Sequence, residues 1–249
     1  MNKSVVIIPT YNEIENVELI IQAVFDLGQD YHVLIVDDSS PDGTADKVRE
    51  MQSVYAETLH LEVRSEKTGL GTAYIHGFKW DLSNDYGFIF EMDADFSHTP
   101  ADLIRLRQAC LDGADVAVGS RYCKGVNVVN WPIRRILLSY GASLYVRVIT
   151  GMPVHDPTAG FMCYRASALR MINFDAIRFV GYAFQIEMKY RAYKQGANIS
   201  EVSIVFTDRV RGVSKMSGAI IKEAVWGVFK MRLDSIFDKK RFYHAEKDS

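Results

Sequence analysis

The chain has 249 residues, 48% of them hydrophobic and 24% charged, which excludes a collagen-like, low-complexity or intrinsically disordered protein. Its net charge of −2 conceals an asymmetry, because residues 1–130 carry 10 Lys/Arg against 21 Asp/Glu and residues 131–249 carry 19 against 10. This split indicates either two solvated faces or an anionic partner held by the second half, such as a nucleotide, a phospholipid or a nucleic acid.

Short β-branched runs alternate with helical patterns through the first half of the chain. Strands are expected at residues 5–8, 33–36, 59–64, 88–92 and 116–118, and helices at 13–27, 42–51, 71–80 and 100–111. Pro9 is expected to end the first strand. Strict alternation predicts right-handed βαβ units and an α/β fold with a largely parallel sheet covered on both faces. Ligands of such sheets bind outside the carboxyl ends of the strands.

The second half is less regular. Helices are expected at residues 132–149, 184–195 and 217–237, strands at 161–164 and 202–206, and a frayed tail at the C-terminus. No internal repeat and no linker rich in Pro, Gly or Ser divides the chain. We therefore expect a single domain.

Cysteine usage and apolar segments bear on the location of the protein. Three widely spaced cysteines without a CxxC pair suit a reducing compartment and argue against a disulfide scaffold or a zinc site. The N-terminal apolar run is too short for a signal-peptide core. No membrane span is expected, because Arg147 interrupts the middle apolar segment, and Lys222 and Lys230 interrupt the last one.

Carboxylates follow three of the expected strands. Pro9-Thr10-Tyr11-Asn12-Glu13 follows the first strand, Asp37 and Asp38 follow the second, and Asp93-Ala94-Asp95 follows the fourth. Each cluster alone is ordinary capping or turn chemistry. Like charges from three strands at one edge repel each other unless a cation or a hydrogen-bonding ligand offsets them. The pattern therefore predicts a binding site there.

The Asp93-Ala94-Asp95 segment points to a metal ion. Carboxylates two residues apart at a strand end can both reach one cation if the chain turns there. Oxygen ligands without a His/Cys cluster favour Mg²⁺ or Mn²⁺, which bind through one or two carboxylates and substrate phosphates. The pair therefore implies a phosphorylated substrate. His98, close by, is expected to be a surface or capping residue.

Phosphate binding also requires cationic side chains. The Lys67–Ala73 turn resembles a phosphate-binding loop, but Tyr74 occupies the third glycine position of GxGxxG, so a dinucleotide site is not expected. Better candidates are Arg121, Arg209 and Lys215. The loop that contains Arg209 and Lys215 is expected to fold over a pyrophosphate, with a merely solvated loop as the alternative.

Six motifs give the chain a resemblance to a known family. They are Ile8-Pro9-Thr10-Tyr11-Asn12-Glu13, Val36-Asp37-Asp38-Ser39-Ser40-Pro41-Asp42-Gly43-Thr44, Asp93-Ala94-Asp95-Phe96-Ser97-His98, Gly119-Ser120-Arg121-Tyr122, Asp156-Pro157-Thr158-Ala159-Gly160-Phe161 and Asp208-Arg209-Val210-Arg211-Gly212-Val213-Ser214-Lys215. With them the chain resembles the family 2 glycosyltransferases, and within these the dolichol-phosphate (polyprenyl-phosphate) mannose synthases. The last two motifs are the more specific.

The resemblance implies a GT-A fold, a three-layer αβα domain over residues 1–237 with a tail at 238–249. Its Rossmann-like nucleotide-binding half would span about residues 1–120, and its acceptor side about 121–237. The implied reaction is an inverting transfer of mannose from GDP-mannose to a polyprenyl (dolichyl) phosphate. The residues implied to bind the nucleotide sugar are Pro9, Tyr11, Glu13, Val36, Asp38, Asp93, Ala94, Arg121, Arg209 and Lys215.

The resemblance also implies roles in the chemistry. Asp95 would ligate Mg²⁺ or Mn²⁺ with Asp93, and Ser97 stands where some relatives place a Gln ligand. Arg121, Arg209 and Lys215 would contact the diphosphate and the acceptor phosphate. Because the acceptor is already an anion, a strong general base is not needed. Asp156 is nevertheless the first carboxylate to test for a catalytic role.

A lipid acceptor requires access to a membrane. Residues 131–149 and 217–237 form amphipathic patterns rimmed with basic residues, as in helices that lie at a membrane surface or face a core. We expect peripheral binding to the cytoplasmic leaflet. The alternatives are a UDP-dependent glucosyl or N-acetylglucosaminyl transferase and a non-catalytic nucleotide-binding subunit. Nucleic-acid binding is not expected, and association of identical chains is left open.

Overall fold

The computed structural model describes residues 3–28, 30–181, 183–208 and 218–237, with the backbone alone for 218–224. Its strands are β1 (Ser4–Thr10), β2 (Tyr31–Asp37), β3 (Leu59–Val63), β4 (Phe88–Glu91), β5 (Val116–Ser120), β6 (Val128–Val129), β7 (Met162–Arg165), β8 (Ile199–Ser203) and β9 (Phe206–Thr207). Its helices are α1 (Val17–Phe25), α2 (Thr44–Gln52), α3 (Leu70–Leu82), α4 (Asp102–Leu111), α5 (Ile133–Thr150), α6 (Ala166–Arg170), α7 (Ala183–Lys194) and α8 (Gly218–Phe237), with a 3-10 turn at Phe174–Ala176.

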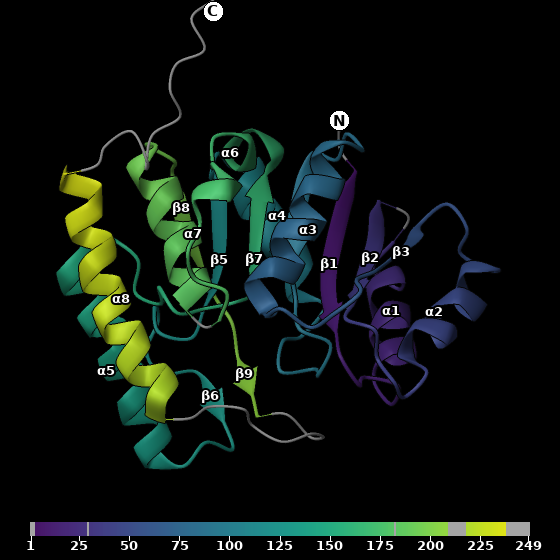
Figure 1. Ribbon diagram of the computed structural model, residues 1–249, viewed down its shortest axis with the longest axis horizontal. Helices are drawn as coiled ribbons and strands as arrows, with labels where there is room; N and C mark the ends of the chain where they lie inside the picture. The colour runs from purple at the N-terminus through teal and green to yellow at the C-terminus, as the bar shows by residue number, and fades with distance from the viewer. Residues whose placement is uncertain (1–2, 29, 182, 209–217, 238–249) are drawn as a thin grey trace, which may run out of the picture.

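Seven strands form one sheet in the order β3-β2-β1-β4-β7-β5-β8 (Figure 1). All neighbouring pairs are parallel except those of β7, which runs antiparallel to β4 and β5. The predicted, mostly parallel sheet is therefore confirmed. The short strands β6 and β9 pair with each other in a second sheet.

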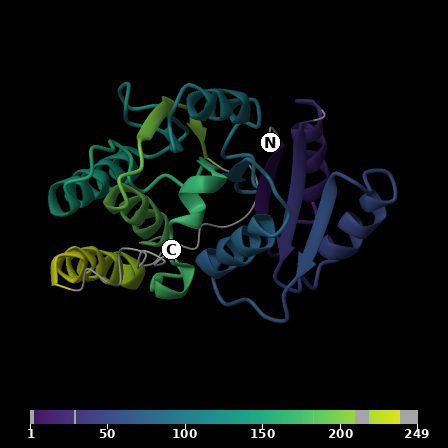
Figure 2. The ribbon, with the colours of Figure 1, turned by 90° about the horizontal axis from the view of Figure 1, so that it is seen from above.

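Helices cover both faces of the sheet (Figure 2). Alternate residues of β1 point to opposite faces, so Val6 packs with α1, α2 and α4, while Ile7 packs with α3, α6 and α7. A third apolar cluster joins α5, α7 and α8 and contains Val146, Tyr190 and Met231. The result is the three-layer arrangement expected of an α/β domain.

The antiparallel strand β7 determines which loops meet at the site. Met162, at the start of β7, lies opposite Glu91 at the end of β4 and Val118 near the end of β5. The chain segment before β7 therefore reaches the same edge as the carboxyl ends of the parallel strands. Simple strand alternation does not predict this reversal.

Pro9 does not end the first strand, contrary to the expectation. The carbonyl of Ile7 accepts a bond from the Met92 amide, so Ile7 and Pro9 both face β4. Because β4 ends at Glu91, the missing N–H of Pro9 removes no ladder bond there, and β1 continues to Thr10.

Two other predicted elements differ from the structure. The helix predicted at 13–27 begins only at Val17, because the Glu13 and Ile14 amides donate to the side chains of Thr44 and Asp42. The strand predicted at 202–206 is split into β8 and β9. The second of these leaves the main sheet to pair with β6.

Asp81 on α3 makes stability depend on pH. Its carboxylate is fully buried, and neither oxygen has a hydrogen-bond partner among the described residues. Burial raises its pKa to about 8, against the lowering effect of Arg170. Because the unfolded chain loses this proton near its ordinary pKa of 3.8, stability falls as the pH rises from about 4 to about 8.

We therefore expect Asp81→Asn to unfold like the wild type at pH 4 and to be more stable at pH 8, by about 1–3 kcal/mol. Urea denaturation at both pH values measures this difference. Asp85→Asn, next to α3, is the control. Equal midpoints for wild type and Asp81→Asn at pH 8 would contradict the prediction.

Candidate active site

The ends of β1 and β2 are joined by a buried carboxylate. Asp37 accepts bonds from the Thr10 hydroxyl at 2.8 Å, the Ser40 hydroxyl at 2.6 Å and the Ser40 amide at 2.8 Å. The Asn12 amide in turn donates to Ser40 Oγ at 3.0 Å. Asp37 thus holds together two loops that carry predicted nucleotide-binding residues. Both of its carboxylate oxygens accept hydrogen bonds from Thr10 or Ser40.

Pro9 lies near the end of β1, and Tyr11 and Glu13 lie on the loop that follows it. All three are half-buried, and the Nζ of Lys67 lies 3.7 Å from the centre of the Tyr11 ring. A cation above an aromatic face holds the ring in place. The loop therefore offers an ordered aromatic side chain next to a basic one.

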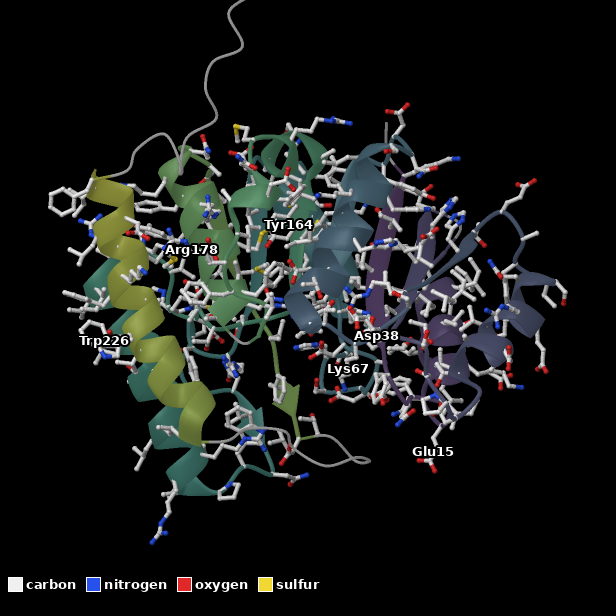
Figure 3. The ribbon with its side chains drawn as sticks, viewed as in Figure 1. Glu15, Asp38, Lys67, Tyr164, Arg178 and Trp226 are labelled. Carbon is white, nitrogen blue, oxygen red and sulfur yellow. The ribbon has the colours of Figure 1, made fainter. Side chains whose placement is uncertain are left out.

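Asp38 lies beside Tyr11's loop and is held by an arginine that sequence reasoning missed. Arg64 Nε donates to Asp38 Oδ1 at 2.6 Å, and Arg64 Nη1 donates to Thr72 on α3 at 2.8 Å. Arg64 directly follows β3. In Figure 3, Asp38 and Lys67 lie at the lower edge of the sheet. The position of Arg64 at the end of an expected strand was the signal available in the sequence.

Val36 and Ala94 are predicted contacts whose side chains face the interior. Val36 is fully buried against the α3 side, and Ala94 is buried on the α1 side. Only the backbone of these two residues is therefore available to a nucleotide.

Asp93, Asp95 and Ser97 follow β4 in a tight turn. Phe96 has a φ of 58°, and the Ser97 amide donates to Asp95 Oδ1 at 3.0 Å. The hydroxyl of Tyr74 donates to Asp93 Oδ1 at 3.5 Å. The Ser97 hydroxyl is buried without a hydrogen-bond partner among the described residues.

This donor set fits a divalent cation of the Mg²⁺ class. The described residues contain no group of three or more His, Cys, Asp or Glu side chains placed around one metal position. Two half-buried carboxylates and an unpaired hydroxyl suit an ion that completes its shell with water and substrate phosphates. The turn supplies part of a coordination shell.

Arg121, directly after β5, and Asp156 form a buried ion pair. Arg121 Nε and Nη2 donate to the two carboxylate oxygens at 2.7 Å each, and the Arg121 amide donates to Oδ2 at 3.0 Å. Thr158 Oγ1 accepts a further bond from Nη2 at 2.7 Å. Burial alone would raise the pKa of Asp156, but Arg121 outweighs it and the pKa is lowered. Asp156 is thus an ionised partner of Arg121.

Aromatic rings surround the guanidinium of Arg121. Its carbon lies 5.1 Å from the ring centre of Tyr122 and 5.7 Å from those of Trp131 and Phe206. The guanidinium carbon of a second arginine, Arg135, lies 4.0 Å from the ring centre of Trp131. Rings and carboxylate together give Arg121 one fixed orientation.

His98 is not a surface residue, which corrects the expectation from sequence. It is only 4% exposed and stacks on Phe161 with 4.7 Å between ring centres. Burial lowers its pKa to about 4, with Asp95 opposing and Arg121 reinforcing the shift. The imidazole is therefore neutral at pH 7 and packs against the rings of Phe161 and Phe206. Arg209 and Lys215 lie outside the described residues.

Comparison with known proteins assigns this fold and site to a family. A sequence model described as "Glycosyl transferase family 2" matches residues 5–172. The chain belongs to this family. This glycosyltransferase is 45% identical over 239 residues to the polyprenol monophosphomannose synthase of Mycolicibacterium smegmatis, a match that covers 96% of this chain and 90% of the relative. It is also 45% identical to the undecaprenyl-phosphate mannosyltransferase of Micrococcus luteus, covering 91% and 93% of the two chains.

A solved structure supports the fold of the glycosyltransferase. Glucosyl-3-phosphoglycerate synthase from Mycobacterium tuberculosis, in complex with Mn²⁺, UDP and phosphoglyceric acid, aligns with a TM-score of 0.64 at 16% identity. The alignment covers 99% of this chain and 80% of that one. The expected GT-A fold is thereby confirmed. None of the described helices is both long and apolar enough to cross a bilayer.

Proposed function

We propose that this glycosyltransferase transfers a mannosyl group from GDP-mannose to a polyprenyl phosphate, giving polyprenyl-phosphate mannose and GDP. One observation carries the proposal. The half-buried carboxylates Asp93 and Asp95 share a sheet edge with Arg121, a buried cation held by Asp156. A reaction between two phosphorylated substrates requires such a pairing of metal ligands and a fixed cation. The names of the two relatives at 45% identity support the same reaction.

The donor nucleotide would bind over the ends of β1, β2 and β4. Tyr11 and Asp38 have fixed orientations there through Lys67 and Arg64. The proposed contacts are Pro9, Tyr11, Glu13 and Asp38, the backbone of Val36 and Ala94, and Asp93. GDP-mannose as the donor rests on the sequence resemblance to the mannose synthases.

The diphosphate would lie at the turn after β4. Asp95, Asp93 and Ser97 are the residues that would hold Mg²⁺ or Mn²⁺, which neutralises the charge of a leaving diphosphate when bound. Ser97 offers the unpaired hydroxyl, either directly or through water. These three residues hold the leaving group in a fixed place.

Arg121 would orient the acceptor phosphate for attack. A phosphate oxygen forms the new bond to the anomeric carbon as the bond to GDP breaks on the opposite side, which inverts the configuration. The nucleophile is already an anion, so no proton must be removed. Asp156 accordingly serves to hold Arg121, and the resemblance assigns phosphate contacts to Arg209 and Lys215.

The direct test is to incubate the protein with GDP-mannose, Mg²⁺ or Mn²⁺ and a polyprenyl phosphate, and to extract the lipid. A mannosyl lipid formed only with the metal is the expected result. If the protein used only UDP-glucose or UDP-N-acetylglucosamine, GDP-mannose would be rejected as the donor in favour of the UDP-sugar. Nucleotide binding without turnover of any sugar would favour a non-catalytic subunit.

The surface of α5 and α8 supports peripheral membrane binding, which we place at the cytoplasmic leaflet as part of the proposal. The two helices lie side by side at one end of the molecule (Figure 1). Their exposed apolar residues include Ile133, at 74% exposure, and Trp226, at 72%. Arg134 and Lys230 are also exposed there. An exposed apolar face with basic residues suits an anionic bilayer surface.

We expect the protein to sediment with anionic phospholipid vesicles at low salt. Replacing Ile133 and Leu137 together by Glu should reduce the bound fraction at least about tenfold, because charges would replace apolar side chains that enter the interface. Val54→Glu is the control, since Val54 is 74% exposed but lies after α2. Absence of vesicle binding by the wild type at low salt would refute the proposal.

A further inference from the structure

Lys189 on α7 is a buried cation whose contacts converge on the site. It is fully buried, and its Nζ donates to the carbonyls of Ala159 at 2.6 Å and Gln185 at 2.9 Å. Among the residues that the structure describes, no carboxylate oxygen lies within 4.0 Å of it. Ala159 lies in the loop that carries Asp156 and Thr158, the two side chains that accept hydrogen bonds from the guanidinium of Arg121.

Gln185 stands one helical turn before Lys189 on the same face of α7. Its Nε2 donates to the buried carboxylate of Glu91, the last residue of β4. Asp93 follows two residues later. One face of α7 therefore contacts the strand that leads to the proposed metal ligands and the loop that holds the proposed acceptor-side arginine.

Burial by itself does not favour a lysine at this position. Removing an ammonium group from water costs several kcal/mol, and an apolar side chain of similar volume is often at least as stabilising. Arg191, two residues further along α7, is equally inaccessible but has its own carboxylate partner in Glu187, at 2.7 Å. Lys189 instead holds two main-chain carbonyls and is attracted electrostatically by Glu91 and Asp156.

We infer that Gln185 and Lys189 are positioning residues for the transfer reaction. They hold the end of β4, with Asp93 and Asp95, in a fixed relation to the loop that orients Arg121. This role rests on the function proposed above. Misplacement of reacting groups by about 1 Å can lower a rate about 100-fold. The proposed nucleoside contacts Tyr11 and Asp38 are held by Lys67 and Arg64, so nucleotide binding should change little.

The test is Lys189→Met, which keeps the length of the side chain and removes the charge. We expect a kcat roughly 10- to 100-fold below that of the wild type, with the KM for GDP-mannose changed less than about threefold. Gln185→Met should act in the same direction, and the double variant should lose less than the product of the two single effects. Arg191→Met is the matched control, expected to lower the melting temperature while kcat stays within about twofold of the wild type.

Hydrogen exchange provides a readout without turnover. In Lys189→Met the amides of Arg121 and Ala159, which donate to Asp156, should exchange faster, and in Arg191→Met they should not. Wild-type kcat or unchanged exchange in Lys189→Met would overturn the inference, as would an equal loss of kcat in Arg191→Met. If the wild type transfers no mannose, the proposed reaction is refuted. The hydrogen-exchange comparison then still decides whether Lys189 orders the loop that carries Asp156 and Thr158.

Discussion

Asp95→Asn is expected to reduce mannosyl transfer about 100- to 1000-fold, the range seen when a key charge-stabilising group is lost from an active site. The amide keeps the shape of the side chain and its bond from the Ser97 amide. It removes the negative charge that would hold a divalent cation. The measurement is lipid-linked mannose formed over a titration of Mn²⁺ or Mg²⁺.

A matched control separates this effect from damage to the fold. Asp112→Asn changes an exposed carboxylate at the end of α4 and should leave both activity and metal dependence unchanged. Both variants should melt close to the wild type. Full activity of Asp95→Asn at the wild-type metal concentration would refute its assignment as a ligand.

Asp156→Asn is expected to lower both stability and activity. Removing one partner of a buried ion pair costs about 3–5 kcal/mol, because the guanidinium of Arg121 is left without a counter-charge. We also expect at least about a 100-fold loss of kcat, since Asn offers one acceptor oxygen in place of two, and Arg121 would lose its counter-charge and one of the two side-chain bonds that orient it. Thermal or urea denaturation and steady-state kinetics measure the two effects separately.

The combination with Arg121→Met distinguishes a positioning role from that of a catalytic base. If Asp156 acts only through Arg121, adding Asp156→Asn to Arg121→Met should cost less than about threefold in kcat. Much of the stability lost in Asp156→Asn should return in the double variant, because no unpaired charge remains. A further large loss of kcat on adding Asp156→Asn would instead indicate a base.

Several features of the fold could be predicted because they depend on local sequence. The βα alternation, the mostly parallel sheet and the convergence of Asp38, Asp93 and Asp95 on one edge follow from strand patterns and the rule for carboxyl ends. These loops come directly after strands, so their approximate place is determined once the strands are known. Sequence reasoning therefore placed the loops to which we assign nucleotide binding.

Contacts between side chains distant in sequence could not be predicted. Nothing near Arg64 indicates that it pairs with Asp38, and nothing near His98 indicates that Phe161 covers it. The same holds for Lys189 and the carbonyl of Ala159. Such pairs depend on which strands become neighbours, and strand order is a property of the whole sheet.

The sequence by itself therefore determined the fold class, the carboxylate turn and the family of this glycosyltransferase, because each resides in short motifs and local periodicity. Only the tertiary structure decided that Asp156 is bound to Arg121. The reason is the antiparallel strand β7, whose start opposite Glu91 and Val118 brings the segment before it to the carboxyl edge. The folded chain also left several apolar side chains of α5 exposed, among them Ile133, Leu137 and Val148, while Val146 is buried against α7 and α8.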